Sequence, residues 1–369
     1  MHKYVLFFLL VILVPVAAIA AGMEQRPLYT SAQYLARGGA MGADVDDYNV
    51  IFVNPAGIPL VKDRIYNMEF QLEGSNGITD NLTAFFGYAD KWIITDPNDL
   101  NSLLGKDVGT KLSFLGAYVG DGFALAFLTS GVLDTAYTGA APVSADVFSA
   151  ADITFQVSIA KGFLKNDKLR FGGTGKVVYR ASRVGTLTLT QLQNEGVKPS
   201  GQYSSDGIAF AMDIGSQYTW TYNTYDLSVS ATALDLATPF GINPKFSGNQ
   251  GTVRPPILPA RADLGVGLKF HNIGSGIGFR TNFDIIKSLT KPEASLKDIV
   301  HWGMELKFPR LFFIRSGLYQ MYWTAGLGIK YWVLDMEFAT YATDTAAYNG
   351  DGSRRQCDRR YTFQFSFYF

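Results

Sequence analysis

The sequence predicts an all-β protein: a transmembrane antiparallel β-barrel of about 14 strands, with an N-terminal hatch segment in its lumen. Three observations support this prediction. The chain begins with an export signal, it ends in a strand with one wholly aromatic face, and many segments between these ends alternate apolar and polar residues. We divide the chain into a signal peptide at 1–20, a hatch segment at 21–64 and a barrel at 65–369.

The first residues have the order of a secretory signal. Met1-His2-Lys3 is basic, an apolar run extends from Tyr4 to Val16, and Ala18-Ile19-Ala20 supplies the small residues that signal peptidase recognises. The alternative is a membrane-anchoring helix, but this run is shorter than the roughly 18 apolar residues that a spanning helix needs. The chain has one cysteine, Cys357, so no intramolecular disulfide can form.

The C-terminal strand has one face made only of aromatic side chains. Tyr361, Phe363, Phe365, Phe367 and Phe369 alternate with Thr362, Gln364, Ser366 and Tyr368. Such a face is unusual in water, but the outer surface of a membrane barrel requires apolar side chains. The alternative is the last strand of a soluble β-sandwich.

The composition also favours a barrel over a helical membrane protein. Charged residues make up 17% of the chain, below the roughly 25% that is typical of soluble domains. Mean hydropathy is only +0.07, and no apolar run after the signal is long enough for a spanning helix. A net charge of +0 gives no electrostatic reason to expect nucleic acid as a partner.

Period-two alternation predicts most of the barrel strands. Thirteen segments alternate clearly, and the runs 65–72 and 82–89 do so weakly. Because a barrel with both ends in the periplasm has an even number of strands, we expect one weak run to be a full strand. The thirteen stronger segments are 111–119, 123–129, 152–161, 169–180, 208–221, 225–235, 262–271, 277–285, 301–308, 312–319, 325–331, 333–341 and 361–369.

Charged side chains fall on one face of several later strands. Charges are costly in lipid, so this face is expected to line the lumen. A solvated sheet face is the alternative, because periodicity alone does not distinguish the two. The predicted lumen charges are Arg280, Asp284, Glu305, Lys307, Lys330, Asp335 and Glu337.

Short turns alternate with long loops between these segments. This arrangement is typical of outer-membrane barrels, in which the long loops face the outside. The predicted turns are 120–122, 163–167, 222–223, 272–275 and 309–310, where glycine, asparagine or aspartate occurs in most cases. The predicted loops are 131–151, 182–206, 236–261, 286–300 and 342–359.

The segment before the barrel resembles a known family. In order it contains Gly38-Gly39-Ala40, Asp46-Asp47, Asn49-Val50 and Asn54-Pro55-Ala56. This order is similar to the N-terminal hatch of FadL-type long-chain fatty acid transporters, which carries an Asn-Pro-Ala motif. The later segments 259–267 and 324–331, the second followed by Leu334-Asp335, also resemble FadL-like proteins of the PorV kind.

The resemblance implies a bacterial outer-membrane channel for long-chain fatty acids or other hydrophobic compounds. In such transporters a ligand is captured among the extracellular loops, and a shift of the hatch releases it through the barrel wall. Asn54, Pro55 and Ala56 carry over as hatch residues with a conformational role; the alternative is an ordinary turn before the first strand. The ligand-contacting residues stay unassigned. The expected partners are a hydrophobic small molecule and outer-membrane lipids.

Two other functions are alternatives to uptake. A PorV-like secretion-accessory protein would bind exported proteins through its long loops, and a general porin would need an open lumen, which the hatch disfavours. We expect no enzyme, because His271 and His301 are the only histidines of the mature chain. No cluster has metal-ligand spacing, so no metal and no cofactor are expected.

Overall fold

The computed structural model describes residues 27–75, 107–138, 144–188, 204–241, 254–271, 273–274, 276–289, 296–309, 312–344 and 357–369. The predicted signal peptide, 1–20, and the second weak run, 82–89, lie outside the described residues. Within these ranges no helix has the length and apolar character needed to cross a bilayer.

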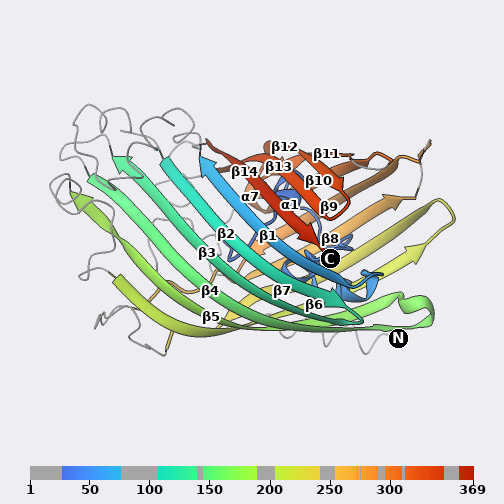
Figure 1. The fold of residues 1–369 in the computed structure, drawn as a ribbon, viewed down its shortest axis with the longest axis horizontal. Coiled ribbons are helices and arrows are strands. Elements are labelled where there is room, and N and C mark those ends of the chain that lie inside the picture. Colours follow the sequence, from blue (N-terminus) through green and yellow to red (C-terminus); the bar gives the residue numbers. More distant parts are fainter. Residues whose placement is uncertain are drawn as a thin grey trace.

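The described strands form a closed barrel of fourteen antiparallel strands in sequence order, with β14 paired to β1 (Figure 1). This confirms the predicted fold class, and the weak run 65–72 is the first strand. The strands are β1 (Ile65–Ser75), β2 (Asp107–Gly120), β3 (Phe123–Thr138), β4 (Ser144–Phe163), β5 (Leu169–Thr188), β6 (Ser204–Thr221), β7 (Tyr225–Ala237), β8 (Arg261–Phe270), β9 (Gly278–Ser288), β10 (Val300–Lys307), β11 (Phe312–Tyr319), β12 (Tyr322–Tyr331), β13 (Leu334–Asp344) and β14 (Cys357–Tyr368).

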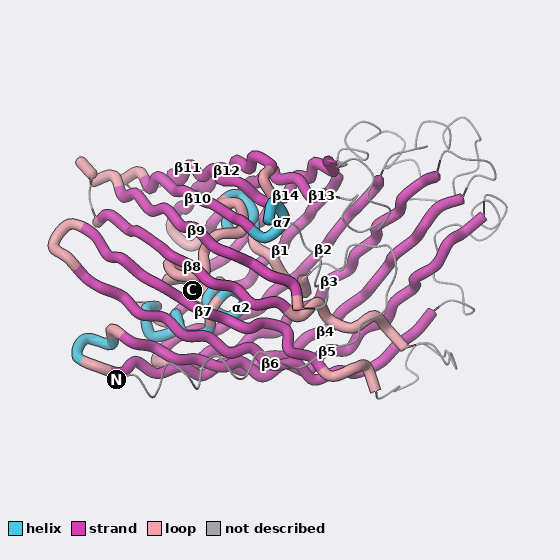
Figure 2. Tube along the Cα trace, turned by 180° about the vertical axis from the view of Figure 1, so that it is seen from behind, coloured by secondary structure: helices cyan, strands magenta, loops and turns pink. Residues whose placement is uncertain are grey.

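The barrel wall is much taller on one side than on the other. Strands β4 and β5 have 20 residues each, whereas β10 and β11 have 8 each, and Figure 2 shows β3 to β5 extending beyond β10 to β12. The predicted loop 131–151 is therefore wrong, because β3 continues to Thr138 and β4 begins at Ser144. Small and polar residues hide the strand pattern there, while the paired backbones continue the ladder.

The two rims of the barrel differ as predicted, with two exceptions: the β3–β4 connection, which spans only residues 139–143, and the β11–β12 connection. Tight turns join β2 to β3, β4 to β5 and β6 to β7 on the rim that also carries the start of β1 and the end of β14. On the opposite rim, the connection between β11 and β12 is not long. It consists of Gln320 and Met321, both with positive φ (51° and 65°), as in the two-residue turns that fit strand twist.

Alternation places aromatic side chains on the lipid face and polar ones inside. In β14, Phe363, Phe365 and Phe367 are 42–48% exposed, whereas Thr362 and Gln364 are at most 2% exposed. The predicted outward face of the C-terminal strand is therefore correct.

The predicted lumen charges fall into two groups. Asp284, Glu305, Asp335 and Glu337 are buried inside the barrel, and the Arg280 side chain is only 12% exposed. Lys307 and Lys330 are exposed. These two lysines share the inward face but lie where β10 and β12 reach the turn rim, so the lumen does not cover them.

Residues 27–64, here called the N-terminal segment, lie inside the ring of strands (Figure 1). The segment contains α1 (Ala32–Ala36), α2 (Val50–Val53) and the 3-10 helix η1 (Pro55–Leu60). Helix α1 contacts β11 to β14, and η1 contacts β4 to β6 on the other side of the barrel. The hydrophobic core therefore lies between this segment and the inner wall. Two further short helices are η2 (Lys165–Asp167), in the β4–β5 turn, and α7 (Leu296–Ile299), before β10.

Candidate functional site

The first anchor of the N-terminal segment is a backbone turn at Gly38 and Gly39. Both glycines have positive φ (63° and 77°), so the chain reverses there without side-chain strain. The Gly38 carbonyl oxygen lies 2.7 Å from His301 Nδ1. A Cβ atom on Gly303 would collide with the Arg37 carbonyl. A Cβ atom on Gly317 would collide with both the Trp302 carbonyl and the Gly38 amide nitrogen. Glycines in the wall therefore let two backbones meet directly.

The second anchor contains the predicted hatch motif, Asn54-Pro55-Ala56. Asn54 is fully buried and caps η1, because its Oδ1 accepts a hydrogen bond from the Ala56 amide at 3.0 Å. Its Nδ2 donates to the Gly42 carbonyl at 2.8 Å. A Cβ atom on Gly172 of β5 would collide with the Pro55 backbone, and one on Gly215 of β6 would collide with Asn54 Oδ1. The motif is thus seated against the tall wall, while its role in gating stays a prediction.

Ion pairs join the middle of the N-terminal segment to strands β8 and β9, here called the low wall. Asp46 lies 2.5 Å from Lys269 Nζ and 3.0 Å from Arg280 Nη1. Arg280 also pairs with Glu305 at 2.8 Å. Burial alone would raise the pKa of Asp46, but the charges of Arg280 and Lys269 hold this pKa well below its ordinary value. The carboxylate therefore stays ionised near neutral pH and fixes the segment electrostatically.

Backbone amides of the segment are also bound by the wall. Asp284 Oδ2 accepts hydrogen bonds from the amides of Met41 and Gly42 at 2.9 and 2.8 Å. Arg37 donates to Asn282 Oδ1 at 2.5 Å, and burial lowers the Arg37 pKa. Asp284, predicted only as a lumen charge, therefore acts as a positioning residue for the N-terminal segment.

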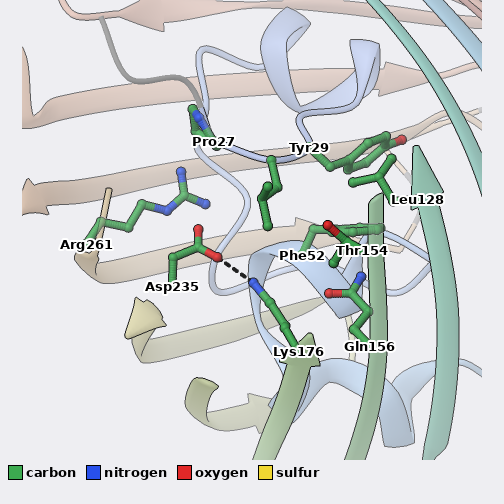
Figure 3. A pocket seen from close by; sticks show the side chains of 10 residues that line it. Pro27, Tyr29, Phe52, Leu128, Thr154, Gln156, Lys176, Asp235 and Arg261 are labelled. Atoms are coloured by element: carbon green, nitrogen blue, oxygen red, sulfur yellow. Dashed lines mark hydrogen bonds and ion pairs between the residues drawn. The ribbon is translucent and has the colours of Figure 1, made fainter. Parts of the chain in front are cut away.

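A small pocket lies between the segment and the inner wall (Figure 3). Its cavity volume is about 10 Å³, the space of about one water molecule. With the segment in this position, the pocket is too small for a ligand larger than about one water molecule. The lining residues are Pro27, Leu28, Tyr29, Phe52, Leu128, Thr154, Gln156, Lys176, Asp235 and Arg261.

One side of this pocket is a compact cluster of charges. Lys176 Nζ lies 2.6 Å from Asp235 Oδ1 and 2.8 Å from Asp213 Oδ2. Asp235 occupies a β-bulge, where the β6–β7 register shifts and φ is 54°. Because of the extra residue, Leu234 and Asp235 are both buried although they are adjacent in the chain.

Sequence reasoning assigned none of the pocket residues. Alternation marks Lys176 as an inward residue of β5, but Asp235 and Arg261 come from strands far along the chain. Their meeting depends on the strand register and on the bulge in β7, neither of which a single sequence displays.

No protein-family model and no curated protein sequence matches this chain. Among solved structures, the deltaS2S3 mutant of the monoaromatic hydrocarbon channel TodX aligns with a TM-score of 0.51 and 10% identity, over 92% of this chain and 98% of that one. The fold is that of the FadL-like outer-membrane channels. The resemblance inferred from the sequence is thereby confirmed at the level of fold, and the barrel is a bacterial outer-membrane protein.

Two further structures are similar at lower scores. The toluene transporter TbuX of Ralstonia pickettii aligns with a TM-score of 0.48 and 11% identity, over 91% of this chain and 97% of that one. A FadL homologue of Pseudomonas aeruginosa aligns with a TM-score of 0.46 and 12% identity, over 95% and 99%.

Proposed function

We propose that this barrel takes up hydrophobic compounds across the outer membrane, with long-chain fatty acids among the candidate ligands. The ligand is captured among the long loops and enters the lumen beside the N-terminal segment. The segment acts as a hatch, and its displacement lets the ligand leave through the barrel wall into the bilayer. Asn54, Pro55 and Ala56 hold the hatch at the tall wall.

The observation that supports this proposal most strongly is the filled lumen. A general porin needs an open aqueous channel, whereas here inward side chains such as Glu69, Asp284 and Gln364 are buried and hydrogen-bonded to the N-terminal segment. Leu28, Tyr29 and Phe52 of the segment occupy the apolar side of the pocket. A hydrophobic ligand can pack against these side chains once residues 27–30 shift and enlarge the pocket.

The first part of the segment, residues 27–30, is held by side-chain hydrogen bonds, including one from the Tyr29 hydroxyl to Glu69 at 2.6 Å. Lys111 Nζ donates to the Pro27 carbonyl at a long 3.4 Å, and Gln71 Nε2 donates to the Thr30 carbonyl at 2.7 Å. The Gly38 and Asn54 anchors, in contrast, involve close backbone packing. Displacement of residues 27–30 would enlarge the pocket and leave both anchors in place.

Mass spectrometry of compounds extracted from the barrel tests the proposal. The full chain is expressed in its native host and purified in detergent, beside a variant that lacks Met23–Arg64. We expect a stoichiometric hydrophobic compound in the full chain and its loss in the variant, whose barrel is checked by heat-dependent gel mobility. Absence of any compound, with an exported protein co-purifying, would overturn uptake in favour of the secretion-accessory role.

A further inference from the structure

We propose that the pocket selects an uncharged ligand, with an apolar body and one hydrogen-bonding group such as a hydroxyl or carbonyl, over an ionised carboxylate. This inference rests on the proposed function and narrows its substrate class. It follows from three features of the pocket: an apolar side, cations that lie within ion-pair distance of aspartates, and two buried polar atoms with no hydrogen-bond partner among the described residues.

The apolar side would contact the body of the ligand. Leu28, Tyr29, Phe52 and Leu128 are each at most 9% exposed. The Tyr29 and Phe52 rings pack with their centroids 4.2 Å apart. The Tyr29 hydroxyl donates to Glu69 at 2.6 Å, so the ring presents only carbon to the pocket.

Among the described residues, each cation on the charged side of the pocket lies within ion-pair distance of an aspartate. Lys176 is shared by Asp213 and Asp235, and Arg261 lies 3.5 Å from Asp263. Two cations therefore face three carboxylates at this side of the pocket. An ionised ligand would have to displace one of these aspartates and would be repelled by the others.

Two buried polar atoms on β4 have no hydrogen-bond partner within the described part of the chain. They are Thr154 Oγ1 and Gln156 Nε2, on side chains that are 0% and 1% exposed. The two residues are two positions apart, so both project from the same face of the strand, and Figure 3 shows them beside Phe52. A buried unpaired polar group is costly, and a ligand hydroxyl or carbonyl would satisfy both atoms. A single water is the other occupant that the cavity volume allows.

The test compares three probes of equal chain length on the purified full chain. Tritiated decan-1-ol is bound at neutral pH and displaced by unlabelled decan-1-ol, decanoate or decane. We expect decan-1-ol to bind about tenfold more tightly than decane, since one good hydrogen bond to a buried group has about that effect. Decanoate is expected to bind more weakly than decan-1-ol.

Variants separate the two polar features of the pocket. The double variant Thr154→Val, Gln156→Leu should bind decan-1-ol about tenfold more weakly and should bind decane as tightly as wild type does. Asp235→Asn should strengthen the binding of decanoate, because it removes one of the carboxylates that compete for Lys176. Thr232→Val is the matched control, since its buried hydroxyl also lacks a partner among the described residues but lies outside the pocket.

Each result has a definite meaning. Decanoate binding as tight as decan-1-ol, unchanged by Asp235→Asn, overturns the inference and leaves uptake of hydrophobic compounds standing. Unchanged decan-1-ol binding in the Thr154 and Gln156 variant also overturns it and assigns those atoms to water. A folded barrel that binds none of the probes overturns the inference together with the proposed function.

Discussion

The carbonyl group of Arg37 occupies the place that a Cβ atom would need on Gly303. The N-terminal segment thus approaches β10 more closely than any residue with a side chain would permit. A second close approach exists across the barrel, where Gly215 faces Asn54. These two contacts fix the segment at both walls, and both can be tested by adding a single methyl group.

Gly303→Ala should detach the first anchor while the fourteen strands of the barrel stay paired. The added methyl overlaps the Arg37 carbonyl, and such overpacking costs about 1–3 kcal/mol. Hydrogen exchange of the amides of residues 34–40 should rise, while heat-dependent gel mobility stays normal. Gly175→Ala is the control, because a Cβ there meets nothing within 4 Å. Equal exchange in the two variants would contradict the backbone anchor.

Asn54→Ala should loosen the second anchor. It removes the cap of η1 and the hydrogen bond to Gly42, for a local cost of about 2 kcal/mol. The expected readout is faster exchange of the amides of residues 56–61. Asn223→Ala, in the exposed β6–β7 turn, should change nothing. If Asn54→Ala behaves like this control, the motif is an ordinary turn and has no anchoring role.

Asp46→Asn should weaken the attachment of the segment to the low wall. Both side chains of the Asp46–Lys269 pair are about one-third exposed (29% and 33%), so solvent screening limits the loss to about 1–2 kcal/mol. Asp121→Asn removes a fully solvated pair with Arg64 and should have no measurable effect. Urea-induced exposure of the segment, measured at neutral pH, compares the two variants.

The pH dependence of this difference has a defined sign. The native pKa of Asp46 is lowered, so its contribution is complete above the ordinary Asp value of about 3.9. That contribution is lost only as pH falls through the lower native pKa. The stability of the segment against urea should therefore be higher in wild type than in Asp46→Asn by a constant amount from pH 8 to about 5. This difference in stability should shrink below about pH 4. A gap that closes near pH 6 would contradict the assignment.

The barrel was predictable because lipid imposes a pattern on each spanning strand. The aromatic face of β14 and the charges on the inner face of β9 and β10 follow directly from that constraint. Residues 131–151 lack the pattern, so the extended parts of β3 and β4 were missed. The Gln320–Met321 turn was missed as well, because neither residue is typical of a turn with positive φ.

The site was predictable only on the side of the N-terminal segment. Gly38, Gly39 and Asn54 stand in a short motif near the start of the chain, so resemblance pointed to them. Their wall partners, such as Gly303 and Gly215, look like the other glycines of the strands. The pocket was hidden for a further reason: it is assembled from the segment and from β3, β4, β5, β7 and β8, and only the closed register brings these together.

Deletion of Met23–Arg64 should convert the barrel into an open pore. In the described part of the chain, the segment covers polar inward side chains, among them Glu69, Asp284 and Gln364. Without it these groups face water, and a lumen of this width conducts ions. Planar-bilayer recordings should show a steady ohmic current for the deletion variant and brief openings for Gly303→Ala. A deletion variant that is folded but as silent as the full chain would show that the loops or the wall side chains close the lumen themselves, and the segment would then lose its proposed role as the hatch.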